Sequence, residues 1–184
     1  LEVSYINGVG LPSYQWYVSA TCDTTDLSNP IGGATLASFT PPSTPVGTLY
    51  YFAVLTFAEG GCSAITSDCA EVIVVTDPEI NITTPLSYTI CIDGEIGDIE
   101  TTVSGGVGTA TYTWYRDGSV VSSGVDLTSY NPTIVEPSIF GTTGTYEFLA
   151  EVNFDGSGCD LATSETVTVI AVSYTHLTLP TTRC

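Results

Sequence analysis

The sequence LEVSYINGVGLPSYQWY at residues 1–17 returns as IETTVSGGVGTATYTWY at residues 99–115, aligned without a gap. Both stretches carry Gly-Val-Gly followed by Tyr-x-Trp-Tyr, and the two tryptophans are Trp16 and Trp114. A repeated stretch of this length indicates that one structural module occurs twice.

A second match extends the repeat toward the end of each copy. Residues 47–62 align with residues 144–159 at almost the same spacing, from Gly-Thr to Gly-Cys. We therefore predict one domain at residues 1–76, truncated at its N-terminus, and a second at residues 77–172. The linker Thr76–Glu79 is short and contains a proline that cannot continue a β-ladder.

Within each copy, apolar and β-branched residues alternate in short runs that are separated by Gly, Pro, Asn and Asp. No stretch shows a 3.6-residue apolar period. The pattern predicts an all-β fold of two tandem Ig-like antiparallel β-sandwich domains, with Trp16 and Trp114 in their cores. The clearest runs are YFAVLTF at 51–57, EVIVV at 71–75, TYTWY at 111–115 and TVTVIAV at 166–172.

The charge of the chain excludes several function classes. Its 184 residues include 20 acidic and 2 basic side chains, with His176 as the one histidine and a net charge of -18. General acid/base catalysis leans on His and Lys, and nucleic acids and anionic membranes are bound through Lys and Arg. No apolar run approaches the roughly 20 residues of a membrane span. We expect neither an enzyme, nor a nucleic-acid partner, nor membrane insertion in this segment.

The last twelve residues, SYTHLTLPTTRC at 173–184, match nothing in the first copy. They resemble the translation of a sequencing adapter, and we expect them to lie outside the fold. Without them the chain has no histidine. The remaining charge is then -6 on residues 1–76 and -13 on residues 77–172.

Five cysteines remain, and none is spaced as a CxxC pair, so a zinc site is not expected. Scattered cysteines in a lysine-free chain favour an exported, oxidised protein. Cys22 and Cys69 have no counterpart in the second copy, which predicts that these two pair with each other. The other predicted pair is Cys91 with Cys159. Cys62 is then unpaired in this segment, and its partner is expected upstream.

The pair Cys91–Cys159 meets a geometric objection. In a simple Ig-like order, Cys91 precedes the second strand and Cys159 lies in the last hairpin, at opposite ends of the sandwich. A disulfide needs Cα atoms within about 7 Å. Either the first strand runs differently or the bridges join neighbouring modules.

Acidic clusters in glycine-rich turns make calcium a candidate ligand, because Ca²⁺ binds carboxylate and loop carbonyl oxygens. Neither cluster has EF-hand spacing, and solvated acidic turns that keep the protein soluble are the competing interpretation. The candidate ligands are Asp93, Glu95, Asp98, Asp155 and Asp160.

Tyrosines on alternating strands suggest an adhesive surface. If some of them point outward, they form an aromatic strip on which sugar rings can stack, although single exposed aromatics are common on protein surfaces. The candidates are Tyr5, Tyr50, Tyr51, Tyr88 and Tyr130.

The motifs T-x-C-x-D-G, S-G-G-V-G-T-x-x-Y-x-W-Y, G-T-Y-x-F-x-A-x-V and G-x-G-C-x-x-A-T-S-x-x-V-T-V occur in order along the second copy. They resemble the PKD-like and Ig-like repeats of large bacterial cell-surface proteins, including gliding-motility-type adhesins. The resemblance covers residues 1–172. It implies an extracellular or cell-surface spacer stalk whose partners are neighbouring repeats of the same chain. The alternative is a module that binds a glycan or a surface protein, stabilised by calcium.

Overall fold

The computed structural model describes residues 1–8, 10–58, 63–156 and 158–173 of the chain. The chain divides into two compact units, Leu1–Val75 and Thr76–Cys184, each with its own hydrophobic core. The break falls one residue before the end of the first predicted domain.

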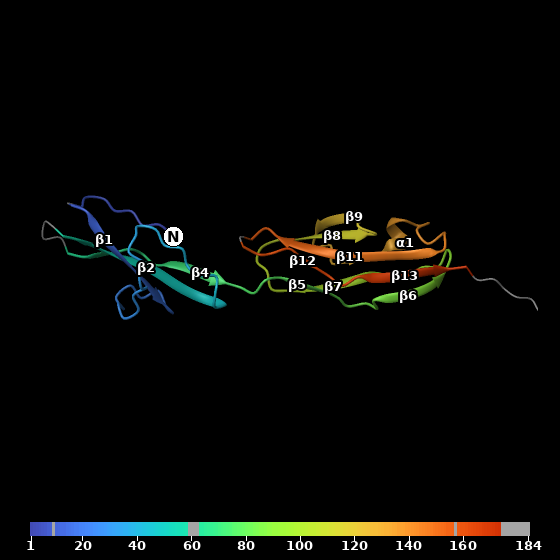
Figure 1. Ribbon diagram of the computed structural model, residues 1–184, viewed down its shortest axis with the longest axis horizontal. Coiled ribbons are helices and arrows are strands. Elements are labelled where there is room, and N and C mark those ends of the chain that lie inside the picture. Colours follow the sequence, from blue (N-terminus) through green and yellow to red (C-terminus); the bar gives the residue numbers. More distant parts are fainter. Residues whose placement is uncertain (9, 59–62, 157, 174–184) are drawn as a thin grey trace, which may run out of the picture. The chain divides into compact units, whose positions relative to one another are not determined.

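The second unit is a sandwich of two β-sheets (Figure 1). The smaller sheet has the strand order β10-β7-β5. The larger has the order β6-β13-β11-β8-β9, and β12 also pairs with β11. The elements are β5 (Glu79–Ile82), β6 (Ser87–Cys91), β7 (Ile99–Ser104), β8 (Ala110–Arg116), β9 (Ser119–Val125), β10 (Ser129–Tyr130), α1 (Pro132–Val135), β11 (Gly144–Phe154), β12 (Ala162–Thr163) and β13 (Val167–Val172).

The chain changes sheet between β5 and β6. Strand β5 pairs antiparallel with β7, whereas β6 pairs parallel with β13, from Ser87 opposite Thr168 to Cys91 opposite Val172. Pro85 lies in the crossing, where the chain leaves one ladder before it joins the next. As a result, one continuous segment covers an edge of both sheets.

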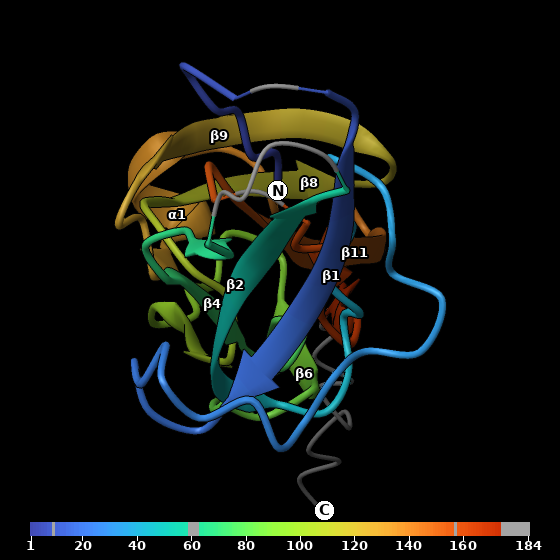
Figure 2. The same ribbon diagram turned by 90° about the vertical axis from the view of Figure 1, so that its left-hand side faces the viewer.

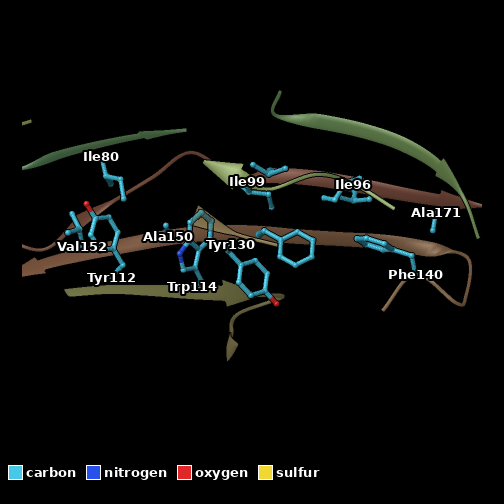
Figure 3. Close-up of a cluster of buried hydrophobic side chains, with 13 residues drawn as sticks. Ile80, Ile96, Ile99, Tyr112, Trp114, Tyr130, Phe140, Ala150, Val152 and Ala171 are labelled. Atoms are coloured by element: carbon cyan, nitrogen blue, oxygen red, sulfur yellow. The ribbon is translucent and has the colours of Figure 1, made fainter. Parts of the chain in front are cut away.

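The core of the second unit is built around Trp114, which is fully buried. Its indole N–H donates to the carbonyl oxygen of Leu127 at 3.1 Å, and its ring stacks on Tyr130 with centroids 5.6 Å apart (Figure 3). A buried Trp or Tyr adds large apolar area but needs a partner for its polar atom, and Leu127 supplies it for Trp114. Phe140 and Phe148 extend this aromatic cluster.

The first unit has one four-stranded sheet, in which β2 pairs with β1, β3 and β4. Figure 2 shows β1 and β2 side by side. Trp16 lies on the inner face, and its indole N–H donates to the carbonyl oxygen of Leu36 at 2.9 Å, as Trp114 does to Leu127. The strands are β1 (Pro12–Ser19), β2 (Gly47–Phe57), β3 (Ile65–Thr66) and β4 (Ala70–Val74).

The layer that faces this sheet is short. A single bridge joins Glu2 to Ser38, and the N–H of Val3 donates to the carbonyl oxygen of Ala37 at 2.9 Å. The repeat places Glu2 at the position of Glu100, which pairs with Ser129 in the second unit. Among the residues that the structure describes, the first unit has no counterpart of β5 or β6.

The repeated Gly-Val-Gly motif has a packing reason. A Cβ added at Gly106, where φ is +73°, would lie 2.6 Å from the ring of Phe154, and one at Gly8 would lie 2.5 Å from the ring of Phe57. Only glycine lets the turn approach the aromatic ring this closely. The turn and the ring therefore recur as a pair in both copies.

The strand order and the inward alternation make this an all-β, Ig-like antiparallel β-sandwich fold, as the sequence predicted.

Candidate functional site

The predicted bridge between Cys22 and Cys69 is present, with Cα atoms 5.9 Å apart. It ties the segment after β1 to the start of β4, the two strands that flank β2. A closed loop of this sequence separation, 47 residues, restricts the unfolded chain and so stabilises the folded first unit.

Two local turns shape the chain that follows Cys22. The carboxylate of Asp23 accepts hydrogen bonds from the backbone N–H of Thr25 at 2.9 Å and from its hydroxyl at 2.6 Å, and Asp26 accepts from the N–H of Ser28 at 2.9 Å. The side-chain and backbone hydrogen bonds of Thr25 lower the pKa of Asp23 below its ordinary value. These hydrogen bonds hold the two turns that follow Cys22.

The predicted pair Cys91–Cys159 is wrong: both thiols are free. Cys91 ends β6 opposite Val172, beside the start of β11, whereas Cys159 follows the end of β11. At about 3.3 Å per residue, an eleven-residue strand separates the two positions by roughly 30 Å. The change of sheet after β5 does not bring them together. Cys62 lies outside the described residues.

The acidic residues of the first predicted calcium cluster are used separately. Asp93 sits in a tight turn with φ at +59°, and its N–H donates to the carbonyl oxygen of Phe140 at 3.0 Å. Asp98 accepts from the side-chain amide of Asn131 at 2.7 Å, and that amide oxygen caps α1. Glu95 is exposed.

In the second cluster, the carboxylate of Asp155 accepts a hydrogen bond from the N–H of Thr109 at 2.7 Å. It thereby joins the turn after β11 to the turn before β8, two turns that the sequence separates by 46 residues. Asp160 is exposed nearby in the sequence. In the part of the chain that the structure describes, no three His, Cys, Asp or Glu side chains gather into a group that could hold a metal ion.

The predicted aromatic strip is not formed. Tyr51 and Tyr130 are 3% exposed and belong to the two cores. Tyr5 and Tyr88 are half-buried against those cores, and Tyr50 is half-buried with its hydroxyl donating to Glu71 at 2.9 Å. All aromatic side chains in the described ranges are buried or half-buried, and none of them is fully exposed.

Arg116 is the one arginine or lysine in the described ranges, and it forms ion pairs with Glu136 and Asp117. The hydrogen bond that the guanidinium donates to the carboxylate of Glu136 raises the pKa of Arg116. Burial raises the pKa of the neighbouring Tyr130, and the hydroxyl of Tyr130 has no hydrogen-bond partner. The Arg116 guanidinium is therefore paired with carboxylates of the second unit and does not form a surface for anionic ligands.

No protein-family model and no curated protein matches the chain. Among solved structures, the fibronectin(III)-like modules of CbhA from Clostridium thermocellum match with a TM-score of 0.42 and 17% identity, covering 96% of this chain and 88% of that chain. The N-terminal four Ig domains of Dscam1 isoform 7.44 match with a TM-score of 0.38 and 14% identity, covering 88% of this chain and 38% of that one. Ig domains 1–5 of Sidekick-1 match with a TM-score of 0.36 and 16% identity, covering 89% and 35%.

No helix in the described ranges has the length and apolar character that a membrane crossing requires. An Ig-like fold with a disulfide is consistent with an extracellular location, and such folds are typically non-catalytic.

Proposed function

We propose that residues 1–172 are a pair of repeat modules from a large secreted or surface-anchored bacterial protein, of the PKD-like and Ig-like class found in gliding-motility-type adhesins. They act as a spacer stalk, and their partners are neighbouring repeats of the same chain. Residues 173–184, with His176 and Cys184, are a non-native tail in this proposal; all but Ser173 lie outside the described residues.

The observation that carries the proposal is the orientation of the aromatic rings. Trp16 and Trp114 each anchor a core through one hydrogen bond to a loop carbonyl oxygen, and two of the tyrosines that would make a glycan platform, Tyr51 and Tyr130, are buried in the cores. Side chains that a binding surface would expose are thus used for packing. This favours a structural module over a sugar-binding one.

The charge distribution supports the same role. Residues 77–172 carry a net charge of -13, and their one arginine is paired with Glu136. Like charges on neighbouring copies repel each other, which keeps closely spaced modules from aggregating. The same charge disfavours nucleic acid and anionic membrane as partners.

One observation favours the alternative, an adhesive module that contacts a surface protein. Ile6 is 86% exposed and Leu11 is 89% exposed, and in the sequence they flank Gly8 and Gly10 of the first unit. Exposed apolar side chains at a loop are a common feature of protein contacts.

A glycan array and a panel of extracellular matrix proteins, probed with the full chain, test the two functions. The spacer predicts no reproducible binding to either. The matched variants are Ile6→Ser with Leu11→Ser, which removes the exposed apolar pair, and Val120→Ser, which removes an apolar side chain on the second unit that is 60% exposed. Binding that the first variant abolishes and the second keeps would replace the spacer by the adhesive module.

A further inference from the structure

Strand β2 of the first unit buries side chains on both of its faces. Tyr51, Ala53 and Leu55 form the core cluster together with Trp16. Phe52, between them in the sequence, is 0% exposed but does not belong to that cluster, because alternation along a strand turns it to the opposite face of the sheet. The outer face of this sheet is therefore closed at Phe52 by something other than the core.

Two neighbours flank Phe52 on this outer face. On one side, Tyr17 of β1 lies opposite it in the ladder, and the two rings stack with centroids 5.4 Å apart. On the other side, the ladder between β2 and β4 ends with Tyr51 opposite Ala70. One residue further along each strand, Cys69 comes level with Phe52, and residues that lie opposite each other face the same side of a sheet.

The bridge from Cys69 to Cys22 brings the chain back across β2. Strands β1 and β4 lie on either side of β2, and adjacent strands are about 4.8 Å apart, so β1 and β4 are separated by roughly 10 Å. The Cα atoms of the two cysteines are only 5.9 Å apart. The chain that leaves β1 at Ser19 therefore crosses toward β4, on the side of Cys69 and Phe52. We call residues 20–28 the strap.

The strap has few other ties to the sheet. All but one of its residues are exposed. Its hydrogen bonds are local, as at Asp23 and Asp26, whose carboxylates each accept from the residue two positions on. The next backbone bond to the sheet comes after the strap, where the N–H of Val18 donates to the carbonyl oxygen of Asn29 at 3.2 Å. Among the described residues, Cys22 is thus the point at which the strap is bonded to the sheet.

The second unit has the same pair of strands without a bridged strap. At the positions of Tyr17 and Phe52 stand Tyr115 and Leu149, which also lie opposite each other in the ladder. Leu149 is half-buried, whereas Phe52 is fully buried. The second copy has no counterpart of either cysteine of the bridge. Closure of this outer face therefore goes together with the bridge and not with the repeated strands.

We propose that the Cys22–Cys69 bridge is a redox-sensitive clasp. When a dithiol reduces it, the strap detaches from the sheet and the Tyr17–Phe52 pair becomes exposed, while the core around Trp16 stays folded. The bridge is within reach of a reductant because Cys22 is exposed. The clasp is independent of the spacer role, because a strap that stays closed after reduction leaves that role standing.

The reaction is thiol–disulfide exchange. A thiolate of the dithiol attacks the sulfur of Cys22, the S–S bond breaks, and Cys69 leaves as a thiolate that takes up a proton. The second thiol of the reductant then displaces Cys22 from the mixed disulfide and closes the oxidised, cyclic reductant. The two protons of the dithiol end on the two cysteines, and two electrons pass to the bridge. A disulfide oxidant such as oxidised glutathione reverses the exchange.

Hydroxyl-radical footprinting of the full chain tests the clasp, because it reports how exposed each side chain is in the folded state. Three samples are compared: the parent with its bridge, the parent reduced with dithiothreitol, capped with iodoacetamide and freed of both reagents, and the double variant Cys22→Ser with Cys69→Ser. Loss of the bridge should raise the oxidation of Tyr17 and Phe52 severalfold. Oxidation of Trp16, in the core, should stay unchanged.

Two controls belong to the same experiment. The matched variant Cys91→Ser with Cys159→Ser removes two free thiols and should give the footprint of the parent. Tyr115 is the internal control, because it has the position of Tyr17 in a unit without the bridge, and its oxidation should not change in any sample. Treatment of the reduced, uncapped chain with oxidised glutathione should restore the parent footprint.

Three results would overturn the proposal. The first is a bridge that dithiothreitol leaves intact in the folded chain, and the second is unchanged oxidation of Tyr17 and Phe52 after the bridge is lost. The third is a rise at Trp16 that matches the rise at Phe52, which would show that the bridge holds the whole unit together. If the double variant does not fold, the reduced parent, which carries no substitution, decides between these outcomes.

Discussion

The two units contain equivalent sheets, but the inward-facing side chains of these sheets are buried to different extents. The inward residues of β13, Val167, Val169 and Ala171, are at most 2% exposed, whereas their counterparts on β4 are only half-buried. The second unit has a core cluster of thirteen buried residues and the first unit one of four. The difference follows from β5 and β6, which cover one unit and have no counterpart in the described part of the other. One crossing segment thus decides how much of an Ig-like sheet becomes core.

The largest expected effect on the free energy of unfolding comes from replacing the two tryptophans. Trp114→Ala should lower the free energy of unfolding of the second unit by about 3–5 kcal/mol, because it empties a fully buried site. Trp16→Ala should cost the first unit less, because fewer buried residues surround it. Differential scanning calorimetry with hydrogen exchange can assign each loss to its unit. Equal losses would contradict the comparison of core depths.

The disulfide gives the next effect. Replacing Cys22 and Cys69 by Ser should destabilise the first unit by about 2–4 kcal/mol, since the closed loop no longer restricts the unfolded chain. The second unit should not change. The matched control replaces Cys91 and Cys159 by Ser, and urea unfolding of that variant should coincide with the parent because those thiols are free.

A smaller effect is expected at the turn that Asp155 holds. Asp155→Ala removes the acceptor for the N–H of Thr109 and should cost the second unit about 1 kcal/mol. Asp160→Ala, at an exposed acidic position a few residues on, serves as the control and should have no measurable effect on the unfolding midpoint. Similar losses in both variants would assign the effect to net charge rather than to the turn.

The smallest effect is a pH dependence at strand β5 of the second unit. The hydrogen bond from Ile82 lowers the pKa of Glu165 below its ordinary value. A depressed pKa in the folded state stabilises the fold above the unfolded value of about 4.3, and this is lost as pH falls through the folded value. The difference in thermal midpoint between the parent and Glu165→Gln should therefore shrink as pH falls from 6 to 3. Asp68→Asn, the counterpart in the first unit, is the control, and a difference independent of pH would refute the assignment to this carboxylate.

The sequence was enough to predict the features that the two copies share or that only one copy has. The Trp16 and Trp114 positions follow from the repeat and both are buried; Cys22 and Cys69 were paired because neither occurs in the second copy, and the disulfide is present. Comparing two copies of one module therefore predicted long-range contacts that alternation alone does not give.

The failures come from contacts between strands that are far apart in the sequence. Strand β2 buries Tyr51 through Leu55 on both faces, with Phe52 stacked on Tyr17, so period-two alternation alone does not show that Tyr51 lies in the core. The parallel pairing of β6 with β13 decides where Cys91 lies, and no local pattern indicates it. Tyr130 points inward because Trp114 stacks on it.

The bridge between Cys22 and Cys69 also sets how the first unit responds when its two ends are pulled apart. Tension passes from one cysteine to the other through the disulfide, so the loop between them, which contains β2, bears no load while the bridge is intact. Reduction releases this loop, and a sequence separation of 47 residues corresponds to roughly 160 Å of additional extended chain. The redox state of one bond therefore fixes the contour length that the first unit can reach.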